Sequence, residues 1–160
     1  MKTKIAIVGK AGSGKTTLAD LIKKDYNFKG LSFALPVKEI AYTYFEMTEK
    51  NRSLLQAVGA KLREIDPEVW VKCMKRRIET SSFHLLIIDD CRYTNEAKML
   101  KDLGFTLVGL EGRQWELTEE QRNHPSETQV DEILPDYIID TSKPLEESKK
   151  ELVDIIYERK

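Results

Sequence analysis

Residues 9–16 of the chain read Gly-Lys-Ala-Gly-Ser-Gly-Lys-Thr, which matches the pattern G-x-x-x-x-G-K-[ST] in full. An apolar run at residues 5–8 precedes this segment, and apolar residues at helical spacing follow it. The glycines let the backbone curl so that successive N–H groups point inward, and the helix that follows adds its positive end. A strand, such a loop and a helix in this order predict a phosphate-binding loop.

Two side chains of this loop carry the chemistry expected of it. Lys15 can neutralise oxygens of the β- and γ-phosphates, and Thr16 offers a hydroxyl to Mg²⁺. We therefore expect ATP and Mg²⁺ as cofactors, with Lys15 on a solvent-facing loop. The residues expected to bind ATP are Gly9, Lys10, Ala11, Gly12, Ser13, Gly14, Lys15, Thr16 and Thr17.

The rest of the chain alternates short apolar runs with longer amphipathic stretches. The short runs predict strands at residues 5–8, 30–33, 85–88, 105–110 and 137–139. Helical spacing predicts helices after the phosphate-binding loop, at 36–47, at 54–65, from a start at 66–68 to 78, at 95–103, and from Pro144 onward. Strands that alternate with helices predict an α/β fold, in which a parallel sheet is covered on both sides.

Length and composition narrow the class of protein. The 160 residues fit one domain, 1–160, and a net charge of −1 argues against a general nucleic-acid binder. Cys73 and Cys91 form no metal-spaced pair, which favours reduced thiols of an intracellular protein. The apolar run near the start is too short for a signal peptide or a membrane span. We expect a cytoplasmic protein with no membrane partner.

Two acids, Asp89 and Asp90, close the apolar run at 85–88. In a parallel sheet the carboxyl end of this strand lies beside the phosphate-binding loop, where a carboxylate can hold Mg²⁺. Neighbouring residues of a strand point to opposite faces, so we expect only one of the two to face the metal. The residues expected at the metal are Thr16, Asp89 and Asp90.

The phosphate-binding loop alone does not identify the acceptor of a phosphoryl group. A GTPase would carry an Asn-Lys-x-Asp motif, which does not occur here, and an AAA-type motor would usually be longer. A small kinase needs further cations, because it transfers a phosphoryl group between two anions. Cations near predicted element ends, or in the polar, aperiodic stretch 111–127, are Lys38, Arg63, Arg92, Arg113 and Arg122. Taken singly, each is more often a solvated surface charge.

Four further segments resemble motifs of the phage-type deoxynucleoside monophosphate kinases. Ser32-Phe-Ala-Leu-Pro-Val-Lys38 resembles that family's SFA-x-PLK, with Leu35 where many relatives have an acid. Residues 54–70 are similar to LQ-x-x-G…R…P-x-x-W. Residues 90–97 resemble D-x-R-x-x-NEA, and residues 124–127 resemble H-x-SE. With the phosphate-binding loop, these segments cover most of the chain in the expected order.

The resemblance implies a three-layer P-loop NTPase fold like that of adenylate kinase, with a five-stranded parallel sheet flanked by helices. It implies a kinase that transfers the γ-phosphoryl of MgATP to a deoxynucleoside 5′-monophosphate, with an acceptor-binding helical region at about 34–82 and a lid-like loop at about 111–127. The catalytic residues that we expect are Lys15 of the phosphate-binding loop, Asp90 and Arg92 of the segment 90–97, and Arg113, which lies where the fourth strand gives way to the lid-like loop and could close over the phosphates. The implied substrate contacts are Phe33, Val37, Lys38, Arg63, Trp70, Asp90, Arg92, Glu96 and Glu127.

Several roles stay open at this point. Trp70 either stacks on a base or packs in the core, and its spacing favours the core. Glu96 is expected to orient Arg92 by an ion pair, and His124 to order its loop or touch a ligand. Residues 140–144 either border the adenine or only cap a helix.

Two alternative functions also stay open. The first is a kinase for phosphomevalonate, a coenzyme precursor or another small phosphorylated metabolite, and the second is a nucleotide-binding regulator without turnover. A homodimer is also left open.

Overall fold

The structure is a computed structural model, and it describes residues 2–158. The chain divides into two compact units. The first unit contains the chain up to Leu31 and again from Ser82, and the second unit is Ser32–Ser81. The bounds of the second unit lie close to those of the helical region expected at 34–82, whose role in binding an acceptor stays a prediction.

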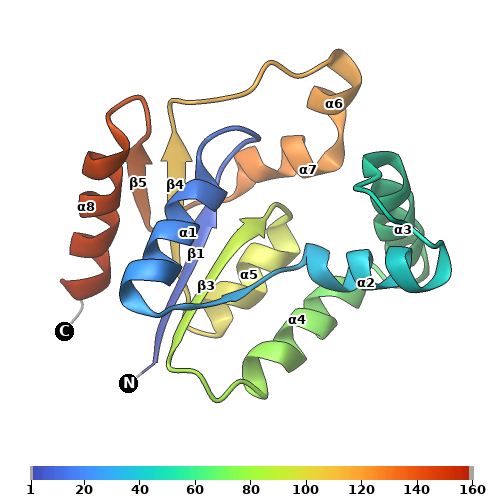
Figure 1. The fold of residues 1–160 in the computed structure, drawn as a ribbon, viewed down its shortest axis with the longest axis horizontal. Helices are drawn as coiled ribbons and strands as arrows, with labels where there is room; N and C mark the ends of the chain where they lie inside the picture. Colours follow the sequence, from blue (N-terminus) through green and yellow to red (C-terminus); the bar gives the residue numbers. More distant parts are fainter. Residues whose placement is uncertain (1, 159–160) are drawn as a thin grey trace. The chain divides into compact units, whose positions relative to one another are not determined.

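The first unit is built on one sheet of five parallel strands, in the order β2-β3-β1-β4-β5 (Figure 1). The strands are β1 (Thr3–Val8), β2 (Lys29–Leu31), β3 (Leu85–Cys91), β4 (Thr106–Glu111) and β5 (Tyr137–Asp140). The predicted α/β class with a five-stranded parallel sheet flanked by helices is confirmed. The carboxyl ends of β1, β3 and β4 meet at one edge of the sheet, and the phosphate-binding loop leaves β1 at that edge.

Helices cover both faces of this sheet. Helices α1 (Lys15–Tyr26) and α8 (Leu145–Tyr157) lie on one face, and α5 (Thr94–Asp102) lies on the other (Figure 1). Alternate residues of a strand point to opposite faces, so Ile5 and Ile7 of β1 pack toward α1 and α8. The core on this side also contains Leu18, Ala19, Ile22, Phe28, Ile87, Val108, Leu110, Ile139, Leu152 and Ile156.

The second unit consists of helices α2 (Ala34–Tyr44), α3 (Arg52–Ile65) and α4 (Val69–Glu79). Asn51 caps α3, because its side chain accepts a hydrogen bond from the Leu54 N–H at 3.0 Å. Trp70 is 5% exposed, and its indole N–H donates to the Gly59 carbonyl at 3.2 Å, which joins α4 to α3. This agrees with the interpretation of Trp70 as a packing residue.

Several boundaries differ from the predicted ones. Helix α2 begins two residues before Pro36, which the first turn tolerates because its N–H groups have no partner within the helix. Helix α4 begins only at Val69, since the Asp66 carboxylate accepts from the Glu68 N–H at 2.9 Å and forms a turn. Strand β3 continues through Asp89 and Asp90 to Cys91, because Cys91 still pairs with Val8 of β1.

The stretch 111–127 is not the irregular loop that its lack of apolar periodicity suggests. It contains α6 (Glu119–Asn123) and begins α7 (Pro125–Thr128), which a 3₁₀ turn, η1 (Gln129–Glu132), follows. No residue of α6 is buried, so capping rather than an apolar face determines this helix. The Thr118 side chain accepts from the Gln121 N–H, and the Gln121 side chain accepts in return from the Thr118 N–H.

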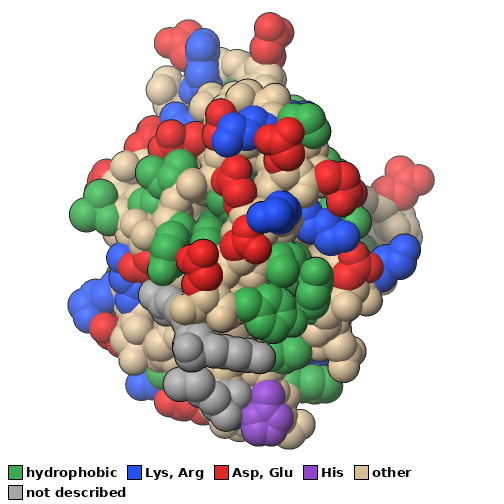
Figure 2. Space-filling model, turned by 90° about the vertical axis from the view of Figure 1, so that its left-hand side faces the viewer, with side chains coloured by type: hydrophobic (Ala, Val, Ile, Leu, Met, Phe, Trp, Pro, Cys, Tyr) green, Lys and Arg blue, Asp and Glu red, His purple; other side chains and the backbone are tan. Residues whose placement is uncertain are grey.

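The surface on the α8 side of the molecule carries acidic and basic side chains intermixed, with apolar side chains between them (Figure 2). This agrees with the near-balance of 26 basic and 27 acidic residues. Every helix within residues 2–158 is too short or too polar to cross a lipid bilayer.

Candidate active site

The phosphate-binding loop has the curled backbone that its glycines predict. Gly12 and Gly14 have φ angles of +79° and +94°, in the left-handed region that side chains disfavour. Gly14 is the N-cap of α1, which begins at Lys15. A Cβ atom at Gly12 would lie 2.4 Å from Cδ1 of Trp115, so the loop also lacks space for a side chain there. A loop of this kind, followed at once by a helix, fits a bound phosphate chain.

Lys15 is 6% exposed, so the expectation that it faces solvent is wrong. Its ammonium group donates to the Lys10 carbonyl at 2.6 Å and to the Ser13 hydroxyl at 3.4 Å. Burial, and then the positive charge of Arg92, lower the pKa of Lys15 to about 8, although the carboxylates of Glu127, Asp89 and Asp90 act in the opposite direction. Lys15 thus lies in a compact group of charges of both signs, and it is still mainly charged at pH 7.

Asp89 and Asp90 are both partly buried near the end of β3, and the negative charge of each acts to raise the pKa of Lys15. Residues 2–158 contain no group of three or more His, Cys, Asp or Glu side chains that could hold a metal ion by themselves. Mg²⁺ is commonly held by only one or two carboxylates together with phosphate oxygens and water. The Thr16 hydroxyl and one of these two acids therefore fit a magnesium ion that enters with the nucleotide.

Three substitutions test this metal assignment. Thr16→Val and Asp90→Asn should each raise the Mg²⁺ concentration that gives half-maximal activity, because valine lacks the ligating hydroxyl and asparagine lacks the negative charge of the carboxylate. If Asp89 is the acid that faces the ion, Asp89→Asn will show the larger rise instead of Asp90→Asn. Magnesium titrations of activity distinguish these results. Unchanged midpoints in all three variants would contradict the assignment.

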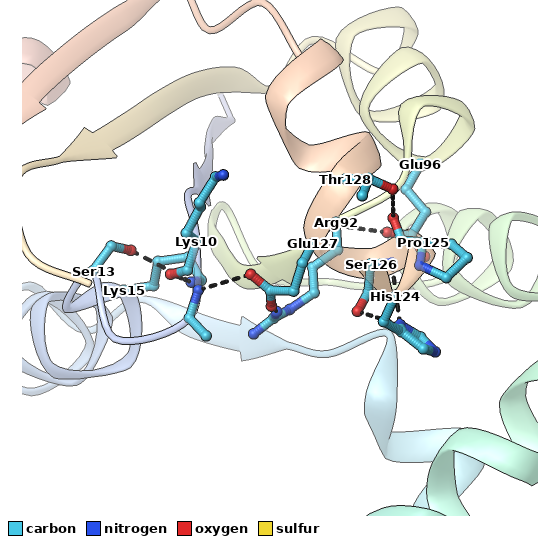
Figure 3. Close-up of polar contacts among 11 residues, drawn as sticks. Lys10, Ser13, Lys15, Arg92, Glu96, His124, Pro125, Ser126, Glu127 and Thr128 are labelled. Carbon is cyan, nitrogen blue, oxygen red and sulfur yellow. Dashed lines mark hydrogen bonds and ion pairs between the residues drawn. The ribbon is translucent and has the colours of Figure 1, made fainter. Parts of the chain in front are cut away.

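Arg92 follows β3 and reaches the same group of charges. Its guanidinium forms an ion pair with the carboxylate of Glu127. The carboxylate of Glu96, which was expected to orient Arg92, contacts the backbone of Arg92. The Glu96 carboxylate accepts from the backbone N–H of Arg92 at 3.0 Å (Figure 3). It also accepts from the backbone N–H of Tyr93 at 3.1 Å and so caps α5. Glu96 therefore determines the backbone around Arg92, whereas Glu127 contacts its side chain.

A cavity of about 60 Å³ lies beside the phosphate-binding loop and the start of α1. Arg113 is one of the residues that line this cavity. The backbone N–H of Arg113 donates to the Thr141 hydroxyl at 3.1 Å, and the Arg113 guanidinium donates to the Lys143 carbonyl at 3.4 Å. The other lining residues are Ser13, Gly14, Thr17, Leu18, Thr141, Lys143, Leu145 and Ser148. Residues from the predicted adenine border at 140–144 thus face the loop across this cavity. The role of Arg113 as a catalytic cation stays a prediction.

The segment 113–117 contacts the phosphate-binding loop through Trp115. This backbone contact was not predicted from the sequence. The Trp115 N–H donates to the Ala11 carbonyl at 3.0 Å, and the Ala11 N–H donates to Glu127 at 3.3 Å. Both polar groups of Ala11 are therefore bonded to the stretch expected to act as a lid. The sequence could not predict these contacts, because they are made by the backbone of Ala11 and not by its side chain.

Gly12→Ala should weaken ATP binding about tenfold or more, because the new methyl group clashes with Trp115 and the φ of +79° becomes strained. The double variant Gly12→Ala/Trp115→Ala should recover only the part of this loss that the indole ring causes, since the strained φ and the clash with the Trp115 backbone nitrogen, 2.5 Å from the new Cβ, remain. Isothermal titration with ATP measures both effects. If the double variant binds no better than Gly12→Ala, contact with the indole ring of Trp115 is not a reason that residue 12 is glycine.

The remaining predicted substrate contacts lie in the second unit. Phe33 is the N-cap residue of α2, and it is buried, as is Val37 in the first turn of that helix. Lys38 and Arg63 are half-buried, on α2 and on the last turn of α3. The structure thus places two cations, Lys38 and Arg63, on neighbouring helices of this unit, and their contact with an acceptor stays a prediction.

A family model described as "AAA domain" matches residues 5–131, which is most of the chain. The matched range contains the phosphate-binding loop, both acids of β3, Arg92 and Glu127. The family model describes a domain and says nothing of a motor assembly. The expectation that the chain is no AAA-type motor therefore stays a prediction. A protein of Acanthamoeba polyphaga mimivirus is 25% identical, over 95% of both chains, and its name assigns it provisionally as a deoxynucleotide monophosphate kinase.

Solved structures with the same fold include three kinases at 15% identity. A sugar kinase from Janibacter aligns with a TM-score of 0.56 over 98% of this chain and 96% of its own. The shikimate kinase of Aquifex aeolicus aligns with a TM-score of 0.56 over 94% of both chains. A gluconokinase from Sinorhizobium meliloti aligns with a TM-score of 0.52 over 98% and 97%. At this identity the likeness shows a shared fold.

Proposed function

Because this chain belongs to the family of the AAA domain, we propose that it is an ATP-dependent kinase whose acceptor is a deoxynucleoside 5′-monophosphate. One observation carries the kinase assignment: Lys15 of the phosphate-binding loop and Arg92 after β3 lie in one group of charges with Asp89 and Asp90. Two cations and a pair of acids at the end of a parallel sheet can hold MgATP and stabilise a phosphoryl group during transfer.

The acceptor assignment rests on two further observations. The mimivirus protein aligns along nearly the whole chain, and its name assigns it provisionally to enzymes that act on deoxynucleotide monophosphates. The segments at residues 32–38, 54–70, 90–97 and 124–127 resemble motifs of such kinases. Lys38 and Arg63 of the second unit are the cations that we assign to the phosphate of the acceptor.

In this proposal the chain positions the reactants and supplies charge, and no covalent intermediate forms on it. The loop N–H groups and Lys15 hold the phosphates of ATP, while Thr16 and one acid of β3 hold Mg²⁺, which neutralises phosphate oxygens when bound. Arg92 stabilises the charge on the transferred group. These interactions accelerate the reaction to the extent that they strengthen in the transition state.

A panel of acceptors tests the proposal, with ADP release as the readout. It contains the monophosphates of the deoxynucleosides and ribonucleosides, plain nucleosides, phosphomevalonate, coenzyme precursors, gluconate and shikimate. We expect turnover with at least one deoxynucleoside monophosphate and little with the plain nucleosides, since a plain nucleoside lacks the phosphate that these cations are proposed to bind. A higher kcat/KM for a different metabolite would contradict the proposed class of acceptor but would still support the assignment as a kinase. Tight ATP binding without any acceptor-dependent turnover would indicate a regulator.

A further inference from the structure

Glu127 is a buried acid at the centre of the contacts around the phosphate-binding loop. Its side chain is 9% exposed, and its two oxygens contact different parts of the protein. Oε1 pairs with the guanidinium of Arg92, and Oε2 accepts the N–H of Ala11 at 3.3 Å (Figure 3). A buried carboxylate needs such partners, because burying it without compensation is costly. Both oxygens therefore have partners inside the protein.

The segment around Glu127 is built to aim this side chain. The backbone N–H of Ser126 donates to Nδ1 of His124 at 3.2 Å, which caps α7, and Pro125 occupies its first turn (Figure 3). The Ser126 hydroxyl lies 2.8 Å from the same nitrogen. Residues 124–127, the segment that resembles H-x-SE, thus form one turn that fixes the direction in which Glu127 leaves the backbone.

The same segment is attached on two sides. Lys10 of the phosphate-binding loop pairs with Asp131 of η1 at 2.9 Å. On the other side, Thr94 at the start of α5 donates to the side-chain oxygen of Gln129 through its backbone N–H at 3.4 Å and its hydroxyl at 3.3 Å. Residues 124–131 therefore bridge the phosphate-binding loop and the start of α5, two residues after Arg92.

We propose that Glu127 is a positioning residue, which holds the guanidinium of Arg92 against the phosphate-binding loop, rather than a contact to the acceptor. The inference rests on the proposed kinase function, in which Arg92 stabilises the transferred phosphoryl group. Arg92 has a long side chain with many rotamers, and the Glu127 carboxylate selects the one that points to the loop. Because the same carboxylate binds the Ala11 N–H, the position of Arg92 is tied to the backbone of the loop.

Steady-state kinetics of Glu127→Gln test this role, with Glu132→Gln as the matched control. Glutamine keeps the shape of Glu127 but removes the ion pair, so we expect kcat to fall about tenfold or more, while the KM of the acceptor changes less than about threefold. Glu132→Gln makes the same chemical change at an exposed site of η1 and should leave both parameters unchanged. An acceptor KM that rises with kcat preserved would identify Glu127 as a substrate contact and overturn the proposal.

The double variant Arg92→Lys/Glu127→Gln separates positioning from folding. If Glu127 acts through Arg92, Glu127→Gln should lower kcat much less in the Arg92→Lys background than in the wild type. If Glu127 only stabilises the fold, the two losses should multiply, and the midpoint of thermal unfolding should fall equally in both backgrounds. That second result would contradict the proposal.

NMR spectroscopy provides a readout that does not depend on the acceptor. In ¹⁵N-labelled protein, Glu127→Gln should shift the side-chain resonances of Arg92 and the backbone N–H resonance of Ala11, whereas Glu132→Gln should shift neither. Unshifted Arg92 resonances would overturn the positioning role. Shifted resonances in a protein that uses none of the tested acceptors would instead show that the ion pair is correct and the proposed function is wrong.

Discussion

Lys15→Ala should lower kcat by about a hundredfold or more, which is the usual cost of removing a cation or donor that stabilises charge in the transition state. The negative charge on the phosphates shifts during transfer, and Lys15 is the cation of the phosphate-binding loop. ADP release with the best acceptor measures the loss. Near wild-type turnover in this variant would contradict the assignment of residues 9–16 as part of an active site.

The fold should survive this substitution. Burial already lowers the pKa of Lys15 to about 8, below its ordinary value of 10.5, so the folded state disfavours the charged form at neutral pH. Removal of this charge offsets the loss of the hydrogen bonds that the ammonium group donates to the Lys10 carbonyl and the Ser13 hydroxyl, so we expect a thermal midpoint at pH 7 close to that of the wild type. Lys24→Ala is the matched control, since Lys24 is an exposed residue in the last turn of α1, the helix that begins at Lys15.

Arg92→Lys should mainly lower kcat, by about tenfold or more, whereas Arg63→Lys should mainly raise the KM of the acceptor. Lysine keeps the positive charge in both variants but loses the planar fork that binds two oxygens at once. A contact made only during transfer affects kcat, and one made equally before and during transfer affects KM.

Kinetics at varied acceptor concentration distinguish the two arginines. Arg76→Lys is a suitable control, because Arg76 is exposed in the last turn of α4, in the same unit as Arg63. If Arg63→Lys lowers kcat and leaves KM unchanged, the second unit does not bind the acceptor phosphate through this residue. If Arg92→Lys changes only KM, Arg92 acts in binding and not in transfer.

The sheet could be predicted because its central strands, β1, β3 and β4, are buried on both faces. Residues 5–8 and 85–88 are continuous apolar runs, and such runs are stable only in the middle of a covered sheet. The boundaries were less predictable, since they depend on pairing between distant segments. Strand β3 continues past its apolar run into Asp89 and Asp90 only because β1 lies beside it.

The stretch 111–127 shows where sequence patterns fail. Short helices held by caps, such as α6 and α7, bury no apolar residue and therefore show no apolar period, since the one buried residue of α7 is Glu127. The ion pair of Arg92 with Glu127 was not predicted for a related reason. Glu96, four residues away, is the natural partner from spacing, but its carboxylate is needed at the start of α5, and the partner came from a segment 35 residues away.

The sequence by itself determined the phosphate-binding loop, the parallel α/β class and the acids and cations at the ends of the strands. These follow from local rules: glycines at fixed spacing, apolar runs that must be buried, and caps at helix starts. Only the tertiary structure decided that Lys15 is buried among charges, that Trp115 covers Gly12, and that Glu127 joins Arg92 to Ala11. Such contacts join residues far apart in the chain, and their partners are determined by how the elements pack.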